Sequence, residues 1–261
     1  MAYLLVFFLR DGIHSRRTLW ISIIGMVPVA CAVLLLLASS IMEVKPHQIY
    51  PQFSYLMFLH FLLPLTAVFI GTAIIGDEVE EKTLPFLLTR PVPRWSIVAI
   101  KALAGIITIG LVILVSFTLT YLVMMSGAGS ASFLRGLPGF FRSSAALMLG
   151  LAVYVPLFGF IGGILKKPVL VGLLFTFGWE SSIAFFPGNA RLLTVVHYLH
   201  SLFPAIRQVT PDDIGRTLFG LVLSANKTPF ILSVFVLAAL SVLFTGLMIM
   251  ILYFKEYRLD D

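Results

Sequence analysis

The chain has 261 residues and a net charge of +6, and 59% of its residues are hydrophobic, 11% are charged, and the mean hydropathy is +1.04. This composition excludes an ordinary soluble domain and predicts an all-α polytopic membrane protein, a single transmembrane domain over residues 1–261 with about six spans of roughly 20 residues. The basic balance then reflects membrane topology rather than nucleic-acid binding, and one cysteine, Cys31, excludes a disulfide framework and a cysteine-based metal site.

An interfacial helix and a first span are the first predicted elements. Residues 1–9 are apolar but too short to cross a membrane, and basic residues follow them directly at Arg10, Arg16 and Arg17. A secretory signal peptide carries its positive charges before the apolar stretch, so residues 1–17 are predicted to form an amphipathic helix at the membrane surface. The first span is expected at 18–41, followed by a short polar loop over 43–51.

The second span is predicted at 55–75 and contains two residues that could have a role in function. His60 is either a packed interior histidine, the commoner case, or a ligand or proton relay. Pro64 is expected to be a tolerated kink, because neighbouring helices and local adjustments can satisfy the carbonyl group that it frees. The third span is expected at 95–125, followed by a loop rich in Gly and Ser over 126–142.

Spans four to six are predicted at 143–165, 169–186 and 229–254. The glycines at the end of span four, Gly159, Gly162 and Gly163, are expected to allow close helix packing. Span five contains Glu180, and a carboxylate in hydrocarbon requires a partner or a proton. Glu180 is therefore either a group on a substrate or proton pathway or a buried structural carboxyl group. Residues 187–228 predict short interfacial or re-entrant helices.

The densest cluster of charge lies between spans two and three, where acidic residues leave the membrane. Thr83 can cap a new helix, with Pro85 in its first turn. Three leucines at i, i+3 and i+4 then share one face: Leu84, Leu87 and Leu88. Arg90 suits the C-terminal carbonyl groups, and the prolines beyond it prevent continuation. The pattern predicts a short amphipathic helix at the membrane surface, although a charged run is also typical of an ordinary solvated loop.

This interval resembles the first cytoplasmic loop of ABC-transporter permeases of the type-2 class. In that family an acidic turn precedes a Thr-Leu pair, a Leu pair, an Arg-Pro-Val-x-Arg motif and a Lys that opens the next span. The matching positions are Asp77, Glu78, Glu81, Thr83, Leu84, Leu87, Leu88, Arg90, Pro91, Val92, Arg94 and Lys101. A second stretch, from Trp179 to Tyr198, is similar to the corresponding part of many such permeases. The resemblance implies that residues 83–94 form a coupling helix that docks into a separate ATPase subunit, with Glu78 and Glu81 beside it.

The distribution of Lys and Arg predicts the orientation. With a cytoplasmic amino terminus, that side of the membrane receives eleven of the 18 basic residues. The other side receives seven, and four of these lie in the long segment before span six. The positive-inside rule therefore favours cytoplasmic termini and a cytoplasmic acidic loop, in the plasma membrane.

The function expected from these features is the permease subunit of an ATP-driven exporter, working with a second permease subunit. The chain has no G-x-x-x-x-G-K-[ST] phosphate loop, so it is not expected to be an enzyme or to hold a cofactor, and ATP and Mg are expected on the partner ATPase. Its other contacts are membrane lipids and not nucleic acid.

A membrane-embedded enzyme, such as a protease or lipid-modifying enzyme, is the alternative. It would use Glu80, Glu81, His60 or His197, but these groups lie in different parts of the predicted topology, and acid–base catalysis needs them within hydrogen-bond reach. His197 and His200 have a spacing that could place them on one helical face, yet no third zinc ligand is evident.

Overall fold

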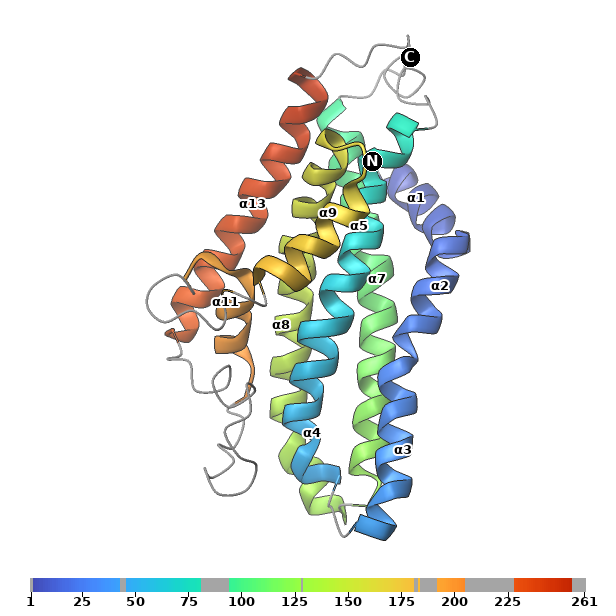
Figure 1. Ribbon diagram of the computed structural model, residues 1–261, viewed down its shortest axis with the longest axis vertical. Helices are drawn as coiled ribbons and strands as arrows, with labels where there is room; N and C mark the ends of the chain where they lie inside the picture. Colours follow the sequence, from blue (N-terminus) through green and yellow to red (C-terminus); the bar gives the residue numbers. More distant parts are fainter. Residues whose placement is uncertain are drawn as a thin grey trace.

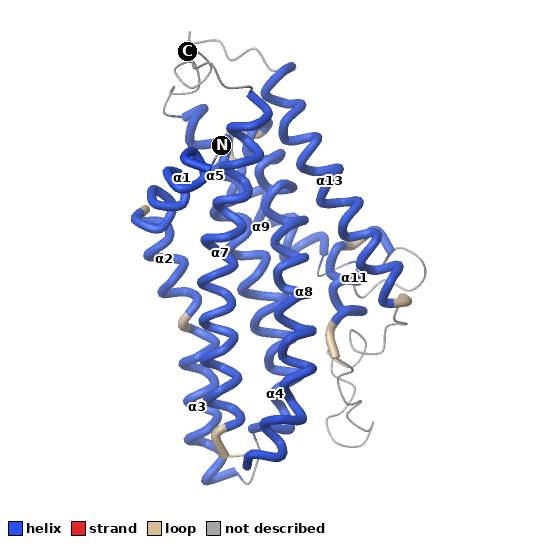
Figure 2. The backbone as a smooth tube through the Cα atoms, turned by 180° about the vertical axis from the view of Figure 1, so that it is seen from behind, coloured by secondary structure: helices blue, strands red, loops and turns tan. Residues whose placement is uncertain are grey.

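The computed structural model describes residues 2–42, 46–80, 94–127, 129–180, 183, 192–204 and 228–254. Within these residues the chain forms an elongated bundle of helices and no strands (Figures 1 and 2). By length and composition, five helical runs can cross a membrane: Arg16–Ser39, Pro46–Gly76, Trp95–Met125, Gly129–Ile164 and Phe230–Ile251.

The amino-terminal helix is separate from the first span, as the sequence predicts, but it ends earlier. Helix α1 (Ala2–His14) packs against α7, and α2 (Arg16–Gly25) begins after Ser15. The Ser15 hydroxyl accepts from the backbone N–H of Thr18 at 3.2 Å, and the Thr18 hydroxyl donates to the Gly12 carbonyl at 2.5 Å. These two bonds fix the turn between α1 and α2. The span continues, after a break at Met26, as α3 (Val27–Met42).

The second run is longer than predicted, because α4 (Pro46–Ser54) occupies most of the expected loop over 43–51. Proline is well tolerated in the first turn of a helix, where its missing N–H has no partner to lose. The Tyr50 ring is buried against α7 (Arg94–Met125), with its centroid 5.2 Å from that of Tyr121 and 6.2 Å from that of Phe117. The loop expectation is therefore wrong, because aromatic burial stabilises a helix that the local composition does not indicate.

Pro64 is accommodated by a change in helix geometry directly before it. The segment η1 (Tyr55–Leu62) is π-helical, and the backbone N–H of Leu63 donates to the Phe58 carbonyl. Helix α5 (Leu63–Glu80) follows, and the Thr66 hydroxyl donates to the carbonyls of Leu62 at 2.8 Å and Leu63 at 3.0 Å. The chain thus adjusts its hydrogen bonds around a residue that has no N–H of its own.

Helix α7 agrees with the third predicted span to within one residue, but the loop expected over 126–142 is wrong. Helix α8 (Gly129–Ile164) begins at Gly129 and includes Pro138. The Tyr121 hydroxyl donates to the Phe133 carbonyl at 2.6 Å, and the Phe133 and Phe140 rings lie 5.2 and 4.9 Å from the Tyr121 ring. These contacts with α7 hold the first turns of α8 in a helix despite their Gly, Ser and Pro content.

The centre of the bundle is the contact between α5 and α8, the most extensive in the molecule. A Cβ added at Gly71 would lie 2.7 Å from the Phe158 Cβ and 2.8 Å from the Val155 carbonyl oxygen. A Cβ added at Gly162 would overlap the backbone of Thr72. The close packing expected of the glycines in span four is confirmed at this crossing, where only hydrogen fits between the two backbones.

The last part of the bundle differs from the prediction in span five. Helix α9 (Pro168–Leu173) and the π-helical η2 (Leu174–Glu180) form a mainly apolar run of 13 residues, about 20 Å of helix and less than a membrane thickness. Most of the expected continuation to 186 lies outside the described residues. Helices α8 and α13 (Phe230–Phe254) both end at the same end of the bundle, so the chain must return across it between them (Figure 1).

Helix α13 has the bounds predicted for the sixth span to within one residue. In the segment before it, α11 (Val195–Leu202) is one of the short helices that the sequence predicts. It is packed between α8, α13 and η1 and most of its residues are buried, so it lies inside the bundle and not at a surface. Residues 187–191 and 205–227 lie outside the described residues.

Candidate functional site

The predicted coupling segment joins two helices that end side by side. Helix α5 ends at Glu80, with Glu78 in its last turn, and α7 begins at Arg94. The two helices pack against each other, and both of these ends lie where α1 and the carboxyl end of α8 also lie (Figure 1). Six predicted contact residues fall outside the described residues: Glu81, Thr83, Leu84, Leu87, Leu88 and Arg90. The helix predicted over 83–94 therefore stays a prediction.

Glu180 is a buried carboxyl group, and it is 2% exposed at the end of η2. The Tyr154 hydroxyl, from α8, donates to Oε2, and the backbone N–H of Val195, from α11, faces the carboxyl group. Oε1 has no hydrogen-bond partner among the described residues. Glu180 therefore joins three segments through neutral donors, an arrangement that fits a structural crosslink and also leaves one oxygen available to a ligand or a proton.

His60 lies in a group of rings centred on Tyr55, which is buried in η1. The Tyr55 ring centroid is 4.7 Å from that of His60, 5.1 Å from that of His200 and 5.9 Å from that of Phe203. Helix α11 thus contacts both the Glu180 carboxyl group, through Val195, and this ring group, through His200. No three His, Cys, Asp or Glu side chains of the described residues are arranged to hold a metal ion.

Tyr154 and Tyr55 are not among the candidate site residues predicted from the sequence, which are mainly charged residues and histidines. Tyr154 is a polar-tipped residue in the middle of an apolar span, and that is the signal that could have found it. Its partner Glu180 lies 26 residues further along on another helix, a separation that no local pattern connects.

Two of the groups that the enzyme alternative would use are kept apart by the fold. His60 lies in η1 and Glu80 at the end of α5, with 20 residues of continuous helix between them. That distance is about 30 Å along the axis, far beyond hydrogen-bond reach.

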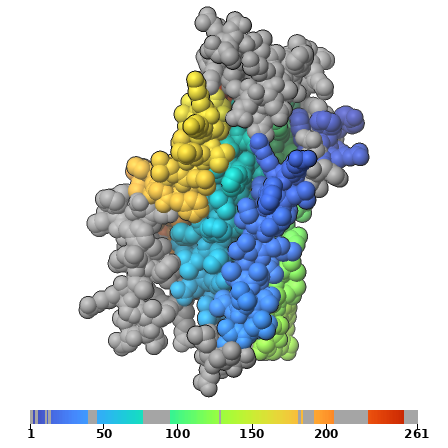
Figure 3. Space-filling model, turned by 45° about the vertical axis from the view of Figure 1, so that its right-hand side comes forward, coloured from blue at the N-terminus to red at the C-terminus, as the bar shows by residue number. Residues whose placement is uncertain are grey.

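A groove of about 850 Å³ opens at the end of the bundle that holds the coupling segment. Helices α2 and α9 form its sides, and the surface of α5 is visible between them (Figure 3). Its lining combines Trp20, Phe69 and Leu173 with the basic side chains of Arg17, Lys166 and Lys167. The sequence placed these basic residues at span ends but did not indicate that they share one groove.

Comparison with known families gives one match, and it covers nearly the whole chain. The model of the ABC-2 family transporter proteins matches residues 9–259. No curated protein matches the chain. Permeases of this family generally dimerise and work with an ABC ATPase subunit. A polytopic helical bundle with five long apolar runs agrees with such a role. The chain therefore belongs to the ABC-2 transporter family, as a membrane-spanning permease subunit of an ABC transporter.

Proposed function

We propose that the chain is the permease of an ATP-driven exporter of the plasma membrane, and that residues 83–94 couple it to a separate ATPase subunit. Two permease subunits, identical or different, would work with two ATPase subunits, which bind the ATP and Mg. The family match over residues 9–259 supports the transporter role. The observation that carries the coupling proposal is that α5 and α7 hold both ends of the interval 81–93 at one end of the bundle (Figure 1).

The same end of the bundle is proposed to be cytoplasmic. Seven of the nine Lys and Arg residues in the described chain belong to helices or turns at this end, and the remaining two, Arg135 and Arg142, lie towards the other end of α8. Basic residues are enriched on the cytoplasmic side of membrane proteins. A segment at this end is therefore accessible to a cytoplasmic ATPase, and both termini are expected to be cytoplasmic.

Coupling would follow from the packing of α5. Closure of the ATPase subunits on ATP would displace residues 83–94 and with them the adjoining ends of α5 and α7. Because α5 makes its most extensive contact with α8, a displacement of α5 would be carried directly into the centre of the bundle. ATP would then drive transport by stabilising one arrangement of the spans over another.

The test is to replace Leu87 and Leu88 with Asp. These leucines are proposed to insert into a groove on the ATPase, so the double variant would bury unpartnered charge, at a cost on the order of several kcal/mol of association. The variant should still insert into the membrane, because the change lies outside the apolar runs. Co-purification of the partner ATPase should fail, and transport-linked ATP turnover with it.

Lys82→Asp provides the control, because it changes charge beside the segment without touching its apolar stripe, and it should have a smaller effect. The measurement is a pull-down of the partner ATPase at equal membrane abundance of each permease. Undiminished recovery with the Leu87→Asp, Leu88→Asp variant would refute the coupling role of this segment while leaving the family assignment intact.

A further inference from the structure

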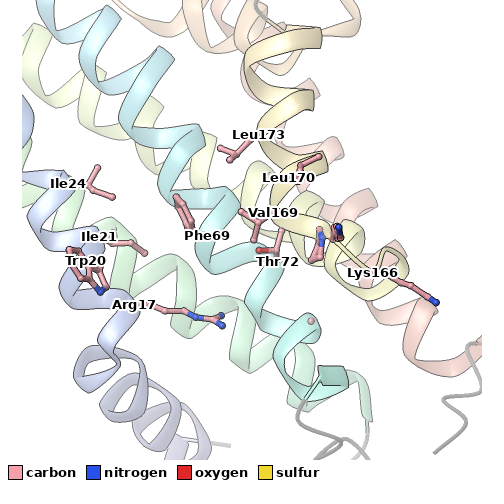
Figure 4. A pocket seen from close by; sticks show the side chains of 13 residues that line it. Arg17, Trp20, Ile21, Ile24, Phe69, Thr72, Lys166, Val169, Leu170 and Leu173 are labelled. Atoms are coloured by element: carbon pink, nitrogen blue, oxygen red, sulfur yellow. The ribbon is translucent and has the colours of Figure 1, made fainter. Parts of the chain in front are cut away.

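The side chains that line the groove beside α5 change from basic to apolar along its length, and they do so in the same direction on two of its walls. On α2, Arg17 lies at one end of the groove and Ile24, two turns later, at the other (Figure 4). On the opposite wall, Lys167 directly precedes α9 and Leu173 ends it. Each wall therefore passes from a cation to a branched aliphatic side chain over about 10 Å of helix.

The third wall follows the same order, although α5 runs in the opposite direction. Gly76 and Thr72 line the end of the groove that holds the cations, and Phe69 lines the other end. The groove is thus apolar at one end and basic at the other. We call the basic end, lined by Arg17, Lys166 and Lys167, its mouth. Since the three walls come from different parts of the sequence, the gradient is a property of the folded bundle.

The charged mouth coincides with the ends of the apolar segments. Arg17 is the second residue of its candidate span, and Gly76 is the last residue of the next one. Lys166 and Lys167 form the exposed turn between α8 and α9. Ends of apolar spans lie at the level of the lipid head groups, so the cations face that layer while the apolar part of the groove faces the acyl chains.

Trp20 marks the same boundary. Its side chain is 67% exposed although it lines the groove. Tryptophan is enriched at the membrane–water interface, where its ring contacts acyl chains and its N–H reaches polar groups. Basic pockets between transmembrane helices at this level bind anionic lipid head groups.

We propose that this groove binds one anionic phospholipid, with its head group at the basic mouth that Arg17, Lys166 and Lys167 line and an acyl chain along Phe69 and Leu173. The charge of the mouth selects a lipid with net negative charge over a zwitterionic one, whose own cation would lie against three basic side chains. A free phosphate would use only the mouth and would gain nothing from the apolar walls. The inference requires the apolar runs to cross a membrane and does not depend on the direction of transport.

The test measures lipid retention by the full chain in detergent, by native mass spectrometry, with phosphatidylglycerol or phosphatidylcholine added. The wild-type chain should retain one phosphatidylglycerol per subunit and much less phosphatidylcholine. Each basic residue near an anionic membrane surface contributes roughly fivefold in affinity, so Lys166→Gln with Lys167→Gln should weaken phosphatidylglycerol binding about 25-fold.

The matched control is Arg16→Gln with Arg135→Gln, which also removes two positive charges, but from exposed positions outside the groove. It should change binding less than about twofold. A second variant, Gly76→Leu, keeps all charges and fills the groove. A Cβ at Gly76 would be 3.7 Å from its nearest neighbour, so the backbone can accept it. This variant should also lose the bound lipid.

Any one of four results would overturn the proposal. The first is equal retention of phosphatidylglycerol by the wild-type chain and the lysine variant, and the second is equal retention of the two lipids by the wild-type chain. The third is competition by inorganic phosphate at the concentration of the lipid, which would make the site one for a free anion. If the lysine variant and Gly76→Leu alter permease dimerisation and leave lipid retention unchanged, the groove is a subunit contact and the proposal is wrong.

Discussion

At the scale of single residues, the buried Glu180 carboxyl group has partners on two other helices. Glu180 accepts from Tyr154 on α8 and faces the Val195 amide on α11. The sequence predicts that a carboxyl group at position 180 needs a partner, since the residues around it are apolar. It cannot identify that partner, because the pairing depends on how two helices are rotated against each other.

Two substitutions of Glu180 distinguish a structural role of its carboxyl group from a direct role in transport. Glu180→Gln keeps an oxygen that can accept from the Tyr154 hydroxyl, so it should retain most transport activity and thermal stability. Glu180→Leu leaves that buried hydroxyl without a partner, which should lower stability by about 1–2 kcal/mol and reduce expression. Tyr154→Phe leaves Oε2 of the buried carboxyl group without its donor, so it should also lower stability. Complete loss of transport in a well-folded Gln variant would instead indicate that the carboxyl group acts on the pathway.

At the scale of helices, the long apolar runs of α7 and α13 were predicted well, whereas the mixed segments that open α4 and α8 were not. Helices α7 and α13 match their predicted spans to within one residue because their length and hydropathy leave one interpretation. The first turns of α4 and α8 contain Pro, Gly and Ser, which locally indicate a loop. They are helical because Tyr50, Phe133 and Phe140 pack on Tyr121, a tertiary contact that a sequence window does not contain.

The crossing of α5 and α8 leads to a test of helix packing. Gly162→Ala would place a Cβ against the backbone of Thr72, which must move away, and we expect a loss of about 1–3 kcal/mol of stability. Gly246→Ala in α13 is the control, since a Cβ there meets nothing within 4 Å and should cost nothing. Thermal unfolding of both variants in the same detergent is the measurement. An unchanged midpoint for Gly162→Ala would show that the two helices can separate without cost.

At the scale of the whole molecule, the fold gives the direction of each helical run. The distribution of Lys and Arg is what predicts which end of the bundle is cytoplasmic. Helix α1, the ends of α5, α8 and α13 and the start of α7 share one end of the bundle (Figure 1). The sequence predicted this grouping by counting spans, and the grouping holds although the fifth span is described only as far as Glu180. The groove of Arg17, Lys166 and Lys167 was beyond prediction because its walls are about 150 residues apart.

The proposed orientation can be tested with two labels. A reporter fused after Asp261 should be cytoplasmic, and a cysteine at Gly127, in a chain with Cys31→Ser, should react with a membrane-impermeant maleimide from outside. Gly127 is in an exposed turn between α7 and α8. Gly136, further along in α8, is less suitable for an insertion, because a Cβ there would lie 2.7 Å from the Tyr121 hydroxyl. Detection of both labels on one side would contradict the odd number of crossings that the proposed topology places between them.

Two glycines of α8 pack against different kinds of atoms, and this difference predicts which second-site mutations can restore transport. Gly162 meets main-chain atoms of Thr72, whereas Gly159 meets the flexible end of the Met248 side chain. The Cβ of Gly159→Ala would overlap the Met248 side chain. Where this overlap lowers transport, a second mutation that shortens Met248, such as Met248→Val, should restore it. No substitution at position 72 can restore a Gly162→Ala strain in this way, because every amino acid brings the same main chain. Selection for revertants should thus recover intragenic suppressors at Met248 for the first allele and mainly true reversion for the second.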